Sequence, residues 1–178
     1  MPEEIEVPTE HLHETIHEHA EHSGDRWTLL VALTTAFLAV LAAITALLAG
    51  HHSNEAMIDQ MQASDQWAYY QAKGIKSSIL QSKMELLASL GKESSGGDKE
   101  KIAEYKKEQK EIEDVAREKG QSSEKHLLTH VTLARAVTVF QVAIALGAIA
   151  VVTKRKPLWY VSLVLGVGGV AFLAWGLM

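Results

Sequence analysis

Histidines are concentrated in the first 25 residues, and their spacing suits metal binding. Five of the nine histidines lie there, with eight carboxylates and no lysine or arginine. On a helix, His13 and His17 share a face at i, i+4 spacing, with glutamates nearby. Imidazole and carboxylate groups so placed bind divalent transition metals such as Zn²⁺, Ni²⁺ or Cu²⁺. The alternatives are a solvated polar helix without a ligand, and a tail whose charge changes at about pH 6.5.

A second histidine pair, His126 and His130, repeats the i, i+4 spacing. The antiparallel pairing predicted below places both opposite residues 57–62, close to Asp59 and Glu55. Two imidazoles and a carboxylate there would form a metal site. The simpler expectation is two partly solvated histidines at a wet part of the helix contact.

Other chemistry is limited by what the chain lacks. There are no cysteines, so disulfides, thiol nucleophiles and Cys–zinc sites are excluded. The run Gly166–Gly169 lies in an apolar segment without a preceding strand, so it is not a phosphate-binding loop. An acidic tail does not neutralise nucleic-acid phosphates. We therefore expect no enzyme, no catalytic residue and no nucleic-acid partner.

Three apolar segments must position these groups, and each is long enough to cross a membrane. Residues 27–50, 136–153 and 157–178 contain no charged residue. A 24-residue helix such as 27–50 is about 36 Å long and exceeds a bilayer core of about 30 Å. We predict an all-α membrane protein with three transmembrane helices, placed at 26–50, 136–153 and 158–178.

Residues 51–135 are predicted to form a long extramembrane antiparallel helical hairpin with coiled-coil-like packing and a turn at 91–97. No proline lies within residues 9–156, and glycine and serine gather at the turn. In the first arm, apolar residues repeat every 11 positions, a period that gives a nearly straight packing stripe. We expect this stripe to face the second arm; it contains Met57, Met61, Ala68, Ala72, Ile75, Ile79, Leu86 and Leu90.

The second arm changes to a seven-residue period, and its predicted contact seam is half polar. One set of seam positions is Ile102, Gln109, Ala116, Ser123, His130 and Val137; the other is Tyr105, Ile112, Lys119, His126 and Leu133. Folding the chain about Ser94 places residue i opposite roughly residue 188 − i, which brings the first two spans into register.

Aromatic and amide side chains gather within two helical turns of the first arm. They are Gln66, Trp67, Tyr70, Gln71 and Lys73. Because Ala68 and Ala72 are expected to face the second arm, Trp67 and Tyr70 would lie outside that contact. Large aromatic rings at such a place are typical of a protein interface. The alternative is aromatic filler at a widened point of the core.

The segment NEAMIDQMQASDQWAYYQAKGIK at residues 54–76 resembles a bacterial membrane family known as domain of unknown function 4337. The preceding HEHAEHSGDRWTLLVALTTAFLAVLAAITALLAG is similar to its first span and pre-span tail, and the resemblance covers nearly the whole chain. It implies a bacterial three-span membrane protein. It implies no reaction and transfers no catalytic residue to this chain.

Charge in the shortest loop predicts the orientation. Lys154–Lys156 and Pro157 form a tight basic turn, and basic residues in short loops stay in the cytoplasm. We therefore expect a multi-pass protein of the bacterial inner membrane. Its N-terminal tail would be cytoplasmic and its hairpin periplasmic.

Surplus apolar surface on the first arm predicts assembly. Trp67, Tyr70, Met84 and Leu87 lie off the predicted stripe, and the second arm is too sparse to cover them. The glycine-rich third span offers close contacts to neighbouring copies in lipid. We expect a homo-oligomeric, membrane-anchored scaffold that contacts lipid and itself. The alternatives are a metal- or pH-responsive protein using the His-rich tail, and an ion-conducting oligomer, although Gln141 is the only strongly polar side chain deep in a span.

Overall fold

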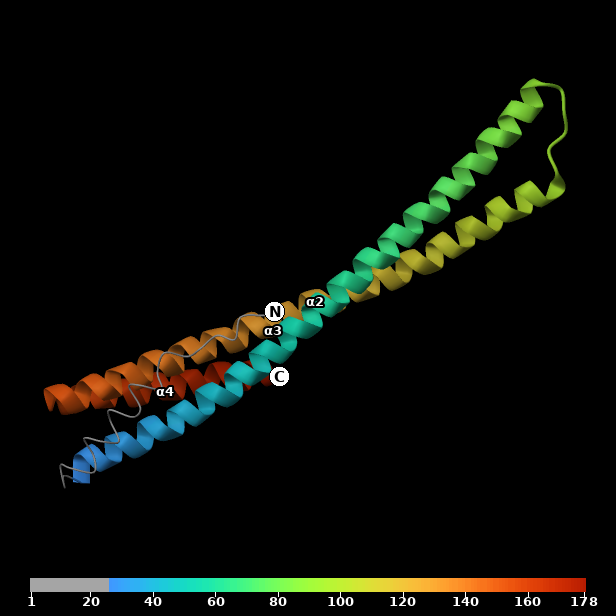
Figure 1. The fold of residues 1–178 in the computed structure, drawn as a ribbon. Coiled ribbons are helices and arrows are strands. Elements are labelled where there is room, and N and C mark those ends of the chain that lie inside the picture. Colours follow the sequence, from blue (N-terminus) through green and yellow to red (C-terminus); the bar gives the residue numbers. More distant parts are fainter. Residues whose placement is uncertain (1–25) are drawn as a thin grey trace. The chain divides into compact units, whose positions relative to one another are not determined.

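The computed structural model describes residues 26–178, which contain helices and no strand (Figure 1). Helix α2 spans Arg26–Ser89, α3 spans Gly96–Thr153 and α4 spans Lys156–Leu177. The His-rich tail, including His13 and His17, lies outside the described residues.

Helix α2 ends in a hydrogen-bonded cap. Gly91 has a φ of +66°, in the left-handed region that glycine tolerates best. Its N–H donates to the Ala88 carbonyl, and the Lys92 N–H donates to the Leu87 carbonyl. This is the Schellman arrangement, which satisfies carbonyls at the end of a helix. A helix break was predicted at this point of the sequence.

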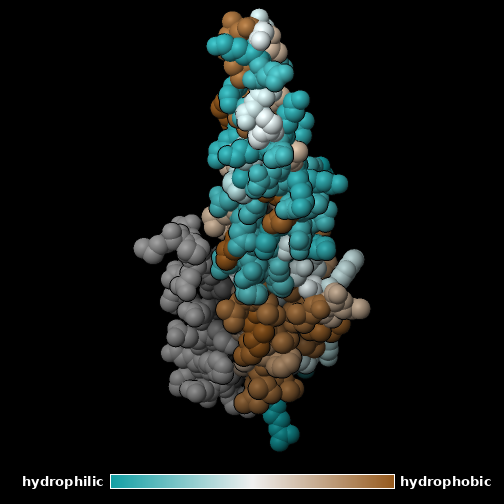
Figure 2. Space-filling view, turned by 90° about the vertical axis from the view of Figure 1, so that its right-hand side faces the viewer, coloured by the Kyte–Doolittle hydropathy of each residue, from teal (hydrophilic) through white to brown (hydrophobic). Residues whose placement is uncertain are grey.

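Each helix contains a segment that is long and apolar enough to cross a membrane. Contacts divide the chain into two compact units. The first contains the described residues 26–53 and 128–178, and the second is Asn54–Leu127. On the face shown in Figure 2, side chains of the first unit are mainly hydrophobic and those of the second mainly hydrophilic.

The first unit packs three helices around a small apolar core. Its buried residues are Leu38, Ala42, Ala136, Phe140, Ala143 and Ile144, and Leu165, Phe172 and Leu173 of α4 pack against them. Glycines allow α4 to approach closely: a Cβ on Gly169 would lie 2.6 Å from Phe140 Cε1, and one on Gly176 would lie 2.7 Å from Leu133 Cδ2. The Ser162 hydroxyl donates to the Ala143 carbonyl at 2.6 Å.

These contacts change the interpretation of the glycine-rich face of α4. We expected it to serve neighbouring copies, but Gly166, Gly169 and Gly176 are occupied within the chain. Gly168 alone among these four glycines has nothing within 4 Å of the position that a Cβ would take. Small residues permit close helix contacts in lipid, and here those contacts are intramolecular.

In the second unit, α2 and α3 meet along a seam with a seven-residue step. The predicted α3 seam is confirmed there, because Ile112, Ala116 and Ser123 are buried. On α2, buried Ala56, Ala63 and Ser77 follow the same step. Half-buried Tyr70 and Met84 continue it. Two helices that pack along a seam must have the same period there. Helix α2 has a seven-residue series that matches α3, and most residues of that series are small.

We predicted that the 11-residue stripe faces α3, and this prediction was wrong. The stripe lies on the opposite side of α2. Its six large members, Met57, Met61, Ile75, Ile79, Leu86 and Leu90, are between 60% and 63% exposed. Ala68 and Ala72 are exposed too. The reason is the mismatch of periods: a 3.67-residue repeat drifts away from a partner that repeats every 3.5 residues. We call these eight residues the outer stripe.

The predicted register was wrong by one heptad. Lys73 forms an ion pair with Glu108, whereas the predicted pairing placed Val115 opposite it. Likewise, Lys83 Nζ lies 2.9 Å from Asp98 Oδ2. Because α2 ends at Ser89, the chain reverses before Ser94. A shift of seven residues keeps the same α3 positions in the seam, so the seam was predicted correctly although its register was not.

Candidate interaction surfaces

Polar side chains of the α3 seam bind carbonyl groups of α2 in the second unit. The Ser123 hydroxyl donates to the Ala56 carbonyl at 2.8 Å, and Gln109 Nε2 donates to the Tyr70 carbonyl at 3.2 Å. A Cβ on Gly74 would lie 2.9 Å from Gln109 Nε2. The small residues of α2 therefore leave space for these polar side chains, and the α2 carbonyl groups accept their hydrogen bonds.

Asp59 is the most buried charged group of the second unit. Its side chain is 9% exposed, and Lys119 Nζ lies 3.1 Å from Oδ1. A hydrogen bond from the Ser122 side chain, followed by the Lys119 ammonium, lowers the pKa of Asp59 below its ordinary value; nearby His126 contributes less. A carboxylate held by a hydroxyl and an ammonium stays ionised. The ion pair of Asp59 with Lys119 joins α2 to α3 in the second unit.

Lys73 is enclosed by contacts inside the second unit. Its Nζ pairs with Glu108 and lies 5.2 Å from the Tyr69 ring centroid and 5.1 Å from that of Tyr105. The Glu108 carboxylate is the main cause that raises the pKa of Lys73. Ion pairing and two aromatic faces favour the cation. With a side chain only 12% exposed, Lys73 offers little surface to another molecule.

The other four predicted interface residues differ in exposure. Trp67 and Gln71 are exposed, whereas Gln66 and Tyr70 are half-buried. The Trp67 and Tyr70 rings meet edge to face, with centroids 5.5 Å apart. Tyr70 thus belongs to the seam with α3, and its ring packs against the ring of Trp67. An intermolecular contact at these residues stays a prediction.

His130 of the second histidine pair contacts a backbone carbonyl of α2. His130 Nδ1 lies 2.8 Å from the Ala49 carbonyl oxygen in the first unit, while Asp59 is taken by Lys119. Within residues 26–178, no group of three His, Cys, Asp or Glu side chains is arranged to hold a metal. Metal binding at His126 and His130 stays a prediction.

The outer stripe is a candidate interaction surface whose position on α2 was predicted wrongly from the sequence. Its residues were recognised by their period, but they were assigned to the contact with α3. The signal that identifies the true seam is the seven-residue series Ala56, Ala63, Tyr70, Ser77 and Met84, which matches the period of α3. Small and mixed side chains made that series less conspicuous than the large apolar residues of the stripe.

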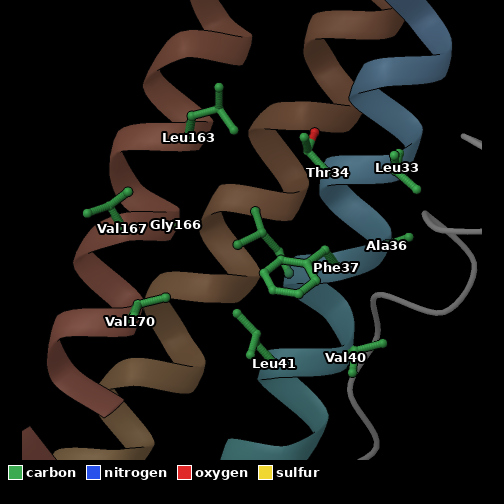
Figure 3. A pocket seen from close by; sticks show the side chains of 11 residues that line it. Leu33, Thr34, Ala36, Phe37, Val40, Leu41, Leu163, Gly166, Val167 and Val170 are labelled. Carbon is green, nitrogen blue, oxygen red and sulfur yellow. The ribbon is translucent and has the colours of Figure 1, made fainter. Parts of the chain in front are cut away.

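A groove of ≈ 750 Å³ opens between α2 and α4 in the first unit (Figure 3). Its lining is apolar apart from Thr34. Trp159 Nε1 donates to Thr34 Oγ1 at 3.2 Å and joins the two helices near one end. A Cβ on Gly166 would lie 2.8 Å from Leu38 Cδ2, so this glycine lets α4 approach the floor of the groove.

In its described part, residues 26–178, the protein is helical, and three helices there are long and apolar enough to cross a membrane. The chain belongs to the family described as Domain of unknown function (DUF4337), whose model matches residues 27–178. The resemblance identified from the sequence is thereby confirmed. No curated protein and no solved structure matches the chain.

Proposed function

We propose that this protein is a homo-oligomeric, membrane-anchored helical scaffold that acts through protein contacts. Its three apolar segments would anchor it in the bilayer, and residues 51–135 would form an extramembrane helical hairpin. The observation that carries the proposal is the outer stripe, a row of large apolar side chains left exposed along α2. An exposed apolar surface of this length is unusual in water and is typical of an interaction site.

The period of the outer stripe favours a second copy of the chain as its partner. An 11-residue repeat packs best against a helix of the same period, and α3 already follows a seven-residue step. Copies anchored in one membrane by the same spans share one orientation. Their α2 helices would therefore run parallel, with identical residues at the same height, as in a closed cyclic assembly.

The energy available from the stripe is comparable with the cost of association. Full burial of one large apolar side chain contributes about 1.5–3 kcal/mol. Six such residues are about 60% exposed, so covering them contributes on the order of 5–11 kcal/mol per copy. Association costs about 4–15 kcal/mol. Anchoring in a membrane lowers that cost, because copies are already oriented and confined to a plane.

The proposed location is the bacterial inner membrane. The basic turn Lys154–Lys156 would face the cytoplasm, as would the acidic tail, and the hairpin would face the periplasm. The support is the charge of a short loop between two apolar segments, together with the three apolar helices.

The mass of the purified full-length protein tests assembly through the stripe. Light scattering in several mild detergents is expected to give a multiple of the 19.5 kDa chain mass. Ile75→Gln with Ile79→Gln should reduce this mass towards one copy while helicity is kept. The matched control is Lys76→Gln with Ser78→Gln, two exposed polar positions on the same turns. A single-copy mass of the wild type, with full helicity, would refute the proposal.

A further inference from the structure

The groove between α2 and α4 ends near an uncommon concentration of positive charge. Arg26 opens α2, and Lys154, Arg155 and Lys156 lie at the start of α4. All four are exposed, and no ion pair within the described residues 26–178 involves any of them. Because α2 and α4 both begin at this end of the first unit, their positive dipole ends add to the charge.

Sequence spacing places two of these cations on the faces that line the groove. On α2, Arg26 is followed by groove residues Leu33 and Val40 at steps of seven. On α4, Lys156 is followed by Leu163 and Val170 at the same step. Residues seven apart lie on the same side of a helix, about 10 Å apart along its axis. Each cation thus continues one wall of the groove.

We propose that this groove binds an anionic phospholipid. One acyl chain lies between α2 and α4 along the apolar walls, and the phosphate is held by Arg26 and Lys156 with help from the basic turn. Basic residues beside apolar clefts at the membrane surface are suited to anionic headgroups. The proposal requires the apolar helices to lie in a bilayer, but it does not depend on assembly through the outer stripe.

Charge favours a lipid over a helix of a second copy. Copies in one membrane share an orientation, so another copy seated in this groove would bring its own basic turn to the same height. Like charges placed together are unfavourable, whereas an anionic headgroup is complementary. The only hydroxyl of the lining, on Thr34, already donates to the Val31 carbonyl and accepts from Trp159. The groove walls are therefore suited to an apolar group such as an acyl chain.

Native mass spectrometry of the full-length protein in neutral detergent tests the proposal. The probes are phosphatidylglycerol and phosphatidylcholine with identical oleoyl chains. The wild type should retain phosphatidylglycerol preferentially. Arg26→Gln with Lys156→Gln should weaken its retention about 25-fold, since each basic side chain near an anionic surface strengthens binding about fivefold. The matched control, Lys106→Gln with Lys110→Gln, changes exposed lysines of the second unit and should have no effect.

Two exposed valines of α4 test the groove itself. Val167 lines it, whereas Val164 does not, and they are 71% and 72% exposed. Val167→Trp should fill the groove and reduce retention of phosphatidylglycerol, while Val164→Trp should leave it unchanged. Soluble glycerol phosphate should not displace the lipid. Equal retention of both lipids by the wild type, equal behaviour of the two tryptophan variants, or displacement by glycerol phosphate would each overturn the proposal. Loss of assembly in Val167→Trp with lipid retention intact would assign the groove to a second copy instead.

Discussion

Met61 and Ala63 stand two positions apart in α2 and have opposite environments: Met61 is 60% exposed and Ala63 is 3% exposed. The larger apolar side chain faces outward and the smaller one faces α3. Both belong to regular series, one with an 11-residue repeat and the other with a seven-residue repeat. Helix α2 therefore has two apolar faces in the second unit, and α3 covers only the one that shares its own period.

Close packing of α4 in the first unit predicts a difference between two neighbouring glycines. Gly169→Leu forces a side chain into Phe140, because even a Cβ would lie 2.6 Å from its ring. Such overpacking typically lowers the free energy of unfolding by about 1–3 kcal/mol. Gly168→Leu should leave the free energy of unfolding nearly unchanged, since nothing lies within 4 Å of the position that a Cβ would take there. Thermal unfolding in detergent, followed by circular dichroism, measures both; equal loss in the two variants would contradict this packing.

The pKa of Asp59 predicts a pH-dependent effect of its replacement. Hydrogen bonds from Ser122 and Lys119 lower this pKa in the folded state. The resulting stabilisation is complete above the unfolded pKa of about 3.9 and is lost as the pH falls through the lower, folded value. Asp59→Asn should lower the unfolding temperature at neutral pH.

The difference between Asp59→Asn and wild type should then shrink below about pH 4, as the wild-type carboxylate becomes protonated. Melting curves measured across this pH range test the sign. Asp65→Asn, at an exposed position of the same helix, is the control and should follow the wild type throughout. A difference that is constant with pH would show that the charge of Asp59 is not responsible.

Removal of a seam hydroxyl predicts a small, local loss of stability. Ser123 is 8% exposed, and its hydroxyl donates to the Ala56 carbonyl. Ser123→Ala should lower the free energy of unfolding by about 1 kcal/mol, the typical net contribution of one hydrogen bond. Ser78→Ala, at an exposed position, should be nearly neutral. Urea titration of both variants measures the difference, and an unchanged Ser123→Ala midpoint would argue against this contact.

Cysteine labelling tests the proposed orientation, because the chain has no native cysteine. A membrane-impermeant maleimide should label Ser94→Cys in intact spheroplasts, since the segment between α2 and α3 would be periplasmic. Thr153→Cys, beside the basic turn, should react only after permeabilisation. The reverse pattern would place the hairpin in the cytoplasm.

Much of the fold was predictable because segregated apolar residues leave few alternatives. The charge-free segments, the absence of proline between residues 9 and 156, and the turn residues near Gly91 define the three helices and their breaks. The α3 seam was predictable because its apolar residues follow one period.

Hydrophobicity alone did not predict which face of α2 contacts α3. Large residues such as Met57 and Ile79 form the more hydrophobic face, yet the seam selects small ones such as Ala56 and Ala63. Packing at a helix contact depends on matching period and on the space that polar partners such as Gln109 require. The groove between α2 and α4 also escaped prediction, since it depends on how α4 meets α2 in space.

The most direct test of the central proposal is cross-linking through the outer stripe in native membranes. Ile79→Cys places a thiol on the stripe, and Ser78→Cys places one on the adjacent exposed position, about 100° around the helix. With a short bifunctional maleimide, parallel α2 helices that meet along the stripe should give a covalent dimer for Ile79→Cys and much less for Ser78→Cys. Absence of a dimer for Ile79→Cys, or equal yields from both variants, would contradict assembly through this face.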